Sequence, residues 1–210
     1  MYPDVVYRLT RLLEKYVSEG RSTPGAPQKN DGNPNIWKSL EIRNEKYETS
    51  KVEHLAVGKK TVVKNKVPLS YTNNGIDVLT DGIRASSWYD DGYWVAVEGE
   101  DLEIIIDLEQ IHNLRKISVG FLEDQNFWIF FPKGIEISLS ENGLTFDSLK
   151  SISRKNNPNK KRTIKDFSVE LEQKKARYIK LKAVGEKTCP KWHKGAGGKA
   201  WLFMDEVIVE

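Results

Sequence analysis

The sequence has a single cysteine among 210 residues, so no disulfide bond within the chain stabilises its fold, and a cysteine-rich zinc site is excluded. Its histidines, His54, His112 and His193, lie far apart and predict no clustered transition-metal site. No run approaches the ~20 apolar residues of a membrane span. An excess of one charge is also lacking. With 33 basic and 30 acidic residues the net charge is +3, which creates no global field that would draw the chain onto nucleic acid.

Short motifs of several enzyme classes are missing as well. The sequence has no Gly-x-Ser-x-Gly elbow, phosphate-binding loop or dinucleotide fingerprint, and the glycine-rich residues 195–198 follow no apolar strand. A glycosidase needs two carboxylates across a cleft, but 30 acidic residues supply plausible pairs by chance. We therefore expect a domain that binds a ligand without reacting with it. An autonomous hydrolase, with a deep cleft and paired carboxylates, is an alternative.

Residues 3–19 are predicted to form an amphipathic α-helix, in which Pro3 suits the first turn and Asp4 complements the N-terminus. Its apolar stripe comprises Val5, Leu9, Leu12, Leu13, Tyr16 and Val17. Gly20 is expected to end the helix, and the proline-rich residues 21–35 predict coil or linker. The stripe needs a partner surface, which is either missing from this chain or provided by the residues that follow.

From Val52 onward the apolar residues repeat with a period of two, which is typical of half-buried β-strands. The inward positions are Leu102, Ile104, Ile106, Leu108, Ile117, Val119, Phe121, Ile135, Ile137, Leu139, Phe167, Val169, Leu171, Ile179, Leu181, Val207 and Val209. Turn residues such as Glu141, Asn142 and Gly143 separate them and favour an antiparallel β-sandwich or jelly roll.

Tryptophan is plentiful, and most of its copies lie in or beside predicted loops. Sugar rings stack on aromatic faces while their hydroxyls need short polar partners, so carbohydrate is the expected ligand. Trp94 and Trp201 are predicted to belong to the core and Trp128 to be partly buried. Trp192, beside Lys191, His193 and Lys194, is predicted to be exposed.

Three segments together resemble the coagulation factor 5/8 type C, or discoidin-like, domains, a family that includes the family 32 carbohydrate-binding modules. They are residues 54–63 (HLAVGKKTVV) leading to 79–88 (LTDGIRASSW), residues 118–143 and residues 192–210, in the family's order. The resemblance is strongest to the discoidin-like domains at the C-terminus of bacterial β-hexosaminidases. It implies an all-β fold, a galactose-binding-domain-like antiparallel sandwich over residues 51–210, and the α-helix predicted above precedes it.

Residues 1–38 resemble a different family, the last helix and tail of a bacterial arylsulfatase, which makes residues 39–50 a linker. The chain lacks that family's nucleophile motif, because Cys189 is followed at once by Pro190 and Trp192 stands where arginine is needed. Cys189 is predicted to be a plain loop thiol, reactive if exposed. The resemblance implies a parent sulfatase that is secreted, periplasmic or on the cell surface, with its signal peptide outside this chain.

The discoidin-like resemblance also implies where ligands bind, at the loops of one end of the sandwich. The residues predicted to contact carbohydrate there are Trp88, Tyr89, Asp90, Glu123, Asn126, Trp128, Trp192 and His193. The basic residues 154–162 are predicted to form a solvated loop without aromatic residues for base stacking, and they could contact a sulfated glycan.

Family 32 modules commonly hold a structural calcium ion, and Asp81, Ser86 and Glu206 match its ligand positions, with main-chain carbonyls completing the oxygen shell. Ile83 stands where the family commonly has a second acidic or amide residue. In the alternative, Asp81 caps a turn and Glu206 pairs with Arg84.

These features predict a non-catalytic carbohydrate-binding module appended to a secreted arylsulfatase, directed to a sulfated or amino-sugar glycan. The alternative is a structural accessory domain that packs on the sulfatase body and binds no sugar.

Overall fold

The computed structural model describes residues 12, 15–21, 23, 25–29, 49–65, 71 and 75–210. The chain divides into two units, residues 1–46 and 47–210.

In the N-terminal unit, Leu12 and residues 15–19 are helical, which agrees with the predicted helix; residues 3–11, 13 and 14 lie outside the described residues. Gly20 has a φ of 66°, and its left-handed backbone ends the helix as predicted. The Arg21 guanidinium donates to the carbonyl oxygens of Thr23 and Ala26, at 2.6 and 3.0 Å, so the described residues after the helix form an ordered coil. Of the linker predicted at residues 39–50, only residues 49 and 50 are described.

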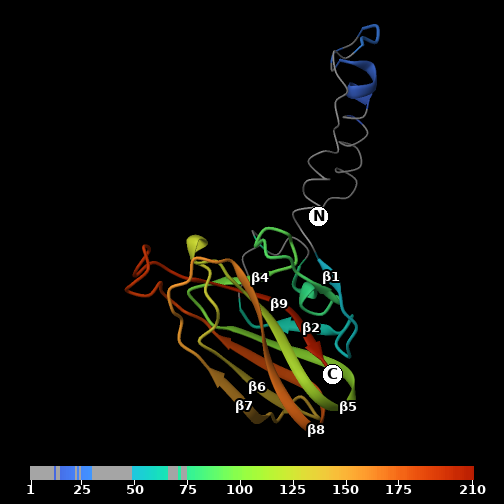
Figure 1. Ribbon diagram of the computed structural model, residues 1–210. Coiled ribbons are helices and arrows are strands. Elements are labelled where there is room, and N and C mark those ends of the chain that lie inside the picture. The colour runs from blue at the N-terminus through green and yellow to red at the C-terminus, as the bar shows by residue number, and fades with distance from the viewer. Residues whose placement is uncertain are drawn as a thin grey trace. The chain divides into compact units, whose positions relative to one another are not determined.

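The C-terminal unit is built almost entirely from antiparallel strands (Figure 1). They are β1 (Ser50–Lys51), β2 (Lys60–Val63), β3 (Ile83–Arg84), β4 (Val95–Glu98), β5 (Leu102–Glu123), β6 (Gly134–Ser140), β7 (Asp147–Ser153), β8 (Thr163–Val184) and β9 (Trp201–Val209), with the 3-10 helices η1 (Ile76–Leu79) and η2 (Gln125–Phe127). The larger sheet has the order β4-β9-β5-β8-β6-β7, and β2 also pairs with β5.

Two layers arise because β5 and β8 each contribute to both. In one layer the second half of β5 lies between β9 and the first half of β8, so Val119 faces Val207 and Phe167. In the other layer the first half of β5 lies between β2 and the second half of β8, to which β6 and then β7 are added. The predicted antiparallel β-sandwich is confirmed.

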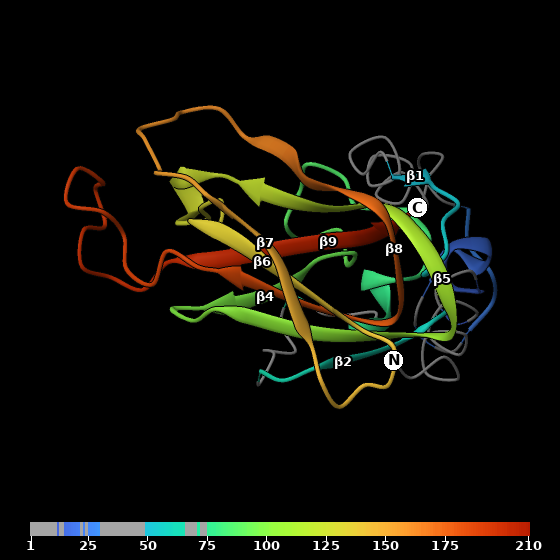
Figure 2. The ribbon, with the colours of Figure 1, turned by 90° about the horizontal axis from the view of Figure 1, so that it is seen from below.

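The crossing between layers occurs at one end of the sandwich, where β5 and β8 both bend sharply (Figure 2). The register between the two strands shifts between Asp107 and His112. Glu109 on β5 and Gln173 on β8 have positive φ angles of 68° and 51°, a left-handed conformation that lets a strand change direction. The loops 124–133, 154–162 and 185–200 lie at the opposite end (Figure 2).

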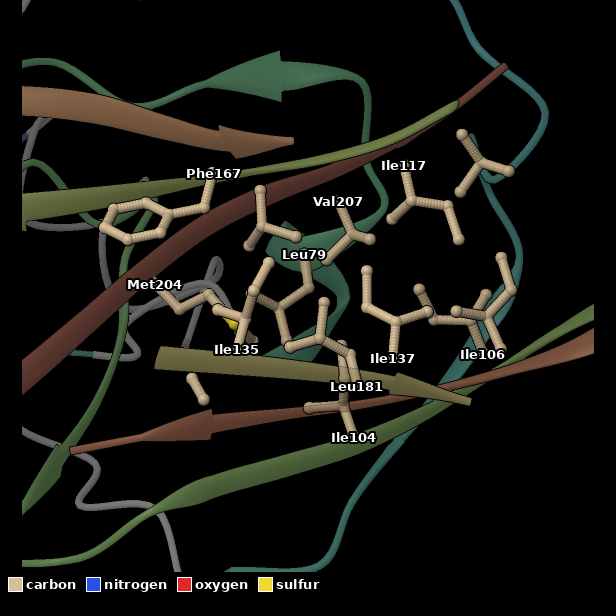
Figure 3. Packing of buried hydrophobic residues seen from close by; sticks show 14 of the residues in the cluster. Leu79, Ile104, Ile106, Ile117, Ile135, Ile137, Phe167, Leu181, Met204 and Val207 are labelled. Atoms are coloured by element: carbon tan, nitrogen blue, oxygen red, sulfur yellow. The ribbon is translucent and has the colours of Figure 1, made fainter. Parts of the chain in front are cut away.

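The core fills the space between the layers with the side chains that the alternating pattern predicted (Figure 3). Leu102, Ile104 and Ile106 are completely buried, and so are their counterparts Ile117 and Val119 farther along β5. Each buried aliphatic side chain contributes about 1.5–3 kcal/mol relative to an exposed one. A register slip of one residue would turn all of them to solvent, so this pattern fixes which loops meet at each end.

Candidate functional site

The segments predicted to contact a ligand are brought together at the end of the sandwich opposite the bends. The Tyr89 and Phe127 rings lie 4.9 Å apart between centroids, which joins the loop before β4 to η2. The Arg162 guanidinium lies 3.9 Å above the Trp88 ring, and its Nε donates to Asp124 Oδ2 at 2.7 Å. We call these assembled loops, residues 86–94, 123–133, 154–162 and 185–200, the loop end.

Gln125 is the hub of the loop end, although nothing in its sequence context suggested this. Its side-chain Nε2 donates to the Asn157 carbonyl at 2.8 Å and to Glu123 Oε1 at 3.2 Å, while its Oε1 accepts from the Asn159 N–H at 2.8 Å. Its own carbonyl oxygen lies 2.7 Å from His193 Nε2. Gln125 therefore ties η2 to both neighbouring loops, to residues 154–162 through its side-chain amide and to residues 185–200 through its main-chain carbonyl.

The His193 ring is buried and holds the loop 185–200 in place. A carbonyl oxygen can only accept, so Nε2 carries the proton donated to Gln125, and Nδ1 accepts from the Gly195 N–H at 3.1 Å. Both Glu123 oxygens are engaged in the same way, by Gln125 and by Asn159. The predicted sugar contacts of Glu123 and His193 stay predictions, and the geometry gives both side chains a positioning role.

Aromatic rings form the exposed part of the loop end. Phe127, Trp128 and Trp192 have 49%, 37% and 41% of their surface exposed, which confirms the predicted exposure of Trp192. The Trp128 ring is supported from below, since a Cβ atom added to Gly195 or Gly198 would lie 2.7 Å from it. The Trp128 ring thus packs against the backbone of the loop 185–200 while remaining open to solvent.

The other predicted contact residues take several positions. Asn126 and Asp90 are exposed, while Trp88 and Tyr89 are half-buried. Trp94 is completely buried and Trp201 is partly buried against the core, as expected.

Asp91 shapes the loop that carries Trp88. Its carboxylate accepts from the Ser86 and Tyr93 N–H groups at 2.6 and 2.9 Å. Burial raises the pKa of this carboxyl above its ordinary value. The Trp94 indole N–H donates to the Ser86 and Trp88 carbonyls at 3.2 and 3.0 Å, which closes the loop on itself.

Cys189 lies at the base of the loop 185–200 and is buried against Phe130 and Ala200. Its backbone N–H donates to the Gly198 carbonyl and its carbonyl accepts from Gly197. Burial raises the pKa of the thiol, so the condition for a reactive loop cysteine, exposure, is not met.

A second cluster of acidic groups lies around Asp81 and Glu206. Glu206 is completely buried; its Oε1 accepts from the Gly82 N–H at 3.0 Å and lies 2.7 Å from His54 Nε2. Its Oε2 is buried without a hydrogen-bond partner among the described residues. Burial, and then the charge of Glu206, raise the pKa of Asp81 to about 6.

The geometry of this cluster bears on the alternative to a calcium site. Asp81 Oδ1 accepts from the Ile83 N–H at 2.8 Å, so Asp81 does cap a turn. The alternative pairing of Glu206 with Arg84 is wrong, because Arg84 binds Asp205 and Asp166.

The carboxylate groups of Asp81 and Glu206 are oxygen donors of the kind that a hard cation such as calcium prefers. An unpartnered buried carboxylate oxygen beside a second carboxyl group is the donor set that calcium prefers. Ser86 Oγ accepts from the Trp88 N–H at 3.2 Å. Within the described part of the chain, no three side chains of His, Cys, Asp or Glu are grouped so as to hold a metal ion.

Comparison with known families decides the classification. The sequence model of the F5/8 type C domain matches residues 63–202. The chain belongs to the F5/8 type C domain family. This confirms the discoidin-like resemblance, whereas residues 1–38 lie outside the match and their resemblance to a sulfatase tail stays a prediction. No curated protein sequence matches the chain closely enough to count as a relative.

Solved structures with this F5/8 type C fold include sugar-binding domains. The lectin domain of lectinolysin, complexed with Lewis B antigen, has a TM-score of 0.52 and 16% identity, covering 77% of this chain and 98% of that one. Chitosan-binding module 1 of a chitosanase/glucanase from Paenibacillus sp. IK-5 has a TM-score of 0.50 and 13% identity, covering 75% and 98%. At such identities the likeness establishes the fold.

As an F5/8 type C domain, the chain shares its fold with a lectin domain and a chitosan-binding module. In the described part of this domain and its N-terminal extension, no helix is long and apolar enough to cross a membrane.

Proposed function

We propose that this domain is a non-catalytic carbohydrate-binding module whose loop end stacks sugar rings on exposed aromatic side chains. The observation that carries the proposal is the exposure of Trp128 and Trp192 on loops fixed by the Gln125 hub. Large aromatic surfaces left in water and held in one orientation are typical of ligand contacts.

The polar groups around the rings suit the same ligand. Asn126 is exposed next to Phe127 and Trp128, and Asp90 is exposed next to Tyr89. Amide and carboxylate groups beside an aromatic face can bind sugar hydroxyls while the ring covers the apolar face of the sugar. A lectin domain bound to Lewis B antigen and a chitosan-binding module share the fold, which supports a carbohydrate ligand.

The wider context that we propose is the C-terminal region of a secreted arylsulfatase, based on the resemblance of residues 1–38. The parent would then be secreted, periplasmic or attached to the cell surface. A binding module linked to a catalytic domain raises the effective concentration of the enzyme on its substrate without adding any contact at the active site.

We also propose that Asp81 and Glu206 bind a structural calcium ion, with Ser86 as a further ligand of the shell. The support is the buried, unpartnered Glu206 Oε2 beside the Asp81 carboxyl group. Calcium would supply the positive charge that these two groups lack.

Sugar binding is tested on a glycan array, followed by calorimetric titration of the best ligand into the full chain. We expect Trp192→Ala and Trp128→Ala each to weaken binding roughly tenfold, because each removes one stacking surface. Ile111→Ala is the matched control, since Ile111 is 52% exposed and lies at the bend of β5, away from the loop end.

Unchanged affinity in both tryptophan variants would place the sugar elsewhere. An array without any bound glycan would instead favour the structural accessory domain.

A further inference from the structure

The loop end carries a concentration of positive charge that the net charge of the chain conceals. Residues 154–162 and 185–200 together contain nine basic residues and one acidic residue, Glu186. Both loops are bound to Gln125, the first through Asn157 and Asn159 and the second through His193. The positive charges therefore belong to two loops that are both bound to η2, the segment that leads into Trp128.

Most of these basic residues have no ion-pair partner among the residues that the structure describes. Some exposed lysines of the two loops pair with no carboxylate of a described residue, and we call them the free lysines. They are Lys155, Lys160, Lys161, Lys191, Lys194 and Lys199. Some lysines elsewhere in the domain do pair: Lys59 lies 2.6 Å from Glu109 and Lys64 lies 2.7 Å from Glu103.

Most acidic groups of the loop end are turned inward. Glu123, Asp124 and Asp91 are each at least 95% buried. The loop 154–162 donates hydrogen bonds to the first two, and Asp91 accepts from N–H groups of its own loop. Glu186 is half-buried and accepts from Asn156 at 3.2 Å. Asp90 is the acidic side chain that stays exposed on the loop 86–94. The buried acids are enclosed by hydrogen bonds and the free lysines are exposed, so the solvent-facing charges of these two loops are mainly positive.

From this arrangement we propose that the carbohydrate ligand is anionic, a glycan that carries sulfate or carboxylate groups along its length. Its sugar rings stack on Trp128 and Trp192, and its anionic groups lie against the free lysines. The inference rests on the proposed sugar-binding function and narrows the ligand to acidic glycans.

The type of basic residue favours a chain of anions over a single one. Recognition of one sulfate or carboxylate group is best served by a partly buried arginine fork. Here Arg162 is already used by Asp124 and Trp88, and the Arg154 guanidinium lies over the Phe131 ring with its Nη1 buried. Exposed lysines contribute little individually, so several spread over two loops suit a ligand with repeated charges.

The test is a glycan array with matched pairs, each glycan present in a neutral form and in a sulfated or uronate-containing form, probed with the full chain. The best acidic ligand is then titrated at salt concentrations from 50 to about 300 mM. Two variants are measured, Lys160→Gln with Lys161→Gln, and Lys191→Gln with Lys194→Gln. The control is Lys174→Gln with Lys175→Gln, two exposed lysines at the bend of β8.

We expect the acidic member of each bound pair to bind more tightly, with affinity that falls as salt rises. Each of the two double lysine variants should lower the affinity for the acidic glycan about fivefold and leave the affinity for the neutral glycan unchanged. The control variant should leave both affinities unchanged. Equal binding of both members at all salt concentrations would overturn the inference while preserving the sugar-binding function. No binding to any glycan would overturn both.

A single-stranded DNA oligonucleotide serves as a competing polyanion. If it displaces the acidic glycan at equal charge concentration, and Trp192→Ala has no effect, the surface is a general polyanion site and the inference fails.

Discussion

Replacing Asp81 by asparagine isolates one carboxyl group whose protonation should control the stability of the domain. The folded protein raises the pKa of Asp81 from 3.8 to about 6, through burial and the neighbouring Glu206 charge. A carboxyl group with a raised pKa binds its proton more tightly in the folded state. The free energy of unfolding therefore falls as the pH rises from about 4 to about 6, and stays lower above that range.

The size of this loss follows from the shift. One pKa unit corresponds to about 1.4 kcal/mol, so the full shift would amount to roughly 3 kcal/mol. Asp81 is only partly buried, and solvent screening reduces this to about 1–2 kcal/mol. For a domain of this size that is a change in melting temperature of about 3–6 °C.

The Asp81→Asn variant keeps the oxygen that accepts from the Ile83 N–H but carries no charge at any pH. In EDTA at pH 7.5 we expect it to be about 1–2 kcal/mol more stable than the wild type, and near pH 4.5 the difference should shrink. Saturating calcium should reverse the order, because the ion needs the charged carboxylate and at 100 times its dissociation constant stabilises by about 2.7 kcal/mol. Urea unfolding followed by tryptophan fluorescence measures all of these values.

Two results would refute this reasoning. Parallel stability profiles of the variant and the wild type between pH 4.5 and 7.5 would show that Asp81 does not carry the raised pKa. Equal stabilisation of both proteins by calcium would show that the ion does not bind at Asp81 and Glu206. Asp91 and Asp205 also have raised pKa values, so the comparison must be the difference between the two proteins.

Two further substitutions test the loop end. Gly195→Ala would place a Cβ atom 2.7 Å from the Trp128 ring, so the ring must shift and glycan affinity, measured by calorimetry, should fall about fivefold with the fold intact. Arg162→Ala would leave the buried Asp124 carboxylate without its cation, and should lower the free energy of unfolding by about 2–3 kcal/mol, measured by urea unfolding.

Each of these has a matched control on its own loop. Ala196 is exposed and adjacent to Gly195, so the Ala196→Ser variant should leave glycan affinity unchanged. Lys161 is exposed and adjacent to Arg162, so the Lys161→Ala variant should have a free energy of unfolding within about 0.5 kcal/mol of the wild type. An Arg162→Ala variant as stable as its control would mean that the pair with Asp124 contributes nothing.

The fold was predictable because its signal is local and repeated. Alternation along residues 102–108 and 117–121 identifies the inward side chains, and Gly143 marks a turn between strands by its position alone. The bends were not predictable. Glu109 and Gln173 adopt positive φ angles although neither residue favours them, since the closure of two layers imposes that conformation from outside the segment.

The candidate site was predictable at the level of loops and much less at the level of side chains. Three segments were expected to converge and do so, but Glu123 and His193, chosen for their hydrogen-bonding chemistry, are turned inward. Gln125, the residue that organises them, sits between charged and polar neighbours that look equally exposed in the sequence.

The reason is the length scale of the determining contacts. A strand side chain is directed by the period of its own strand, whereas a loop side chain is directed by partners far away in sequence: Glu206 meets His54 across 152 residues, and Arg162 meets Asp124 across 38. Composition shows that a loop has polar groups but does not show which of them bind each other. Glu123, which looks like a sugar ligand in the sequence, is instead used in building the loop end. The side chains that still face the solvent there are the aromatic rings and the free lysines. These exposed groups, and not the internally bonded ones, decide which ligand the surface can attract.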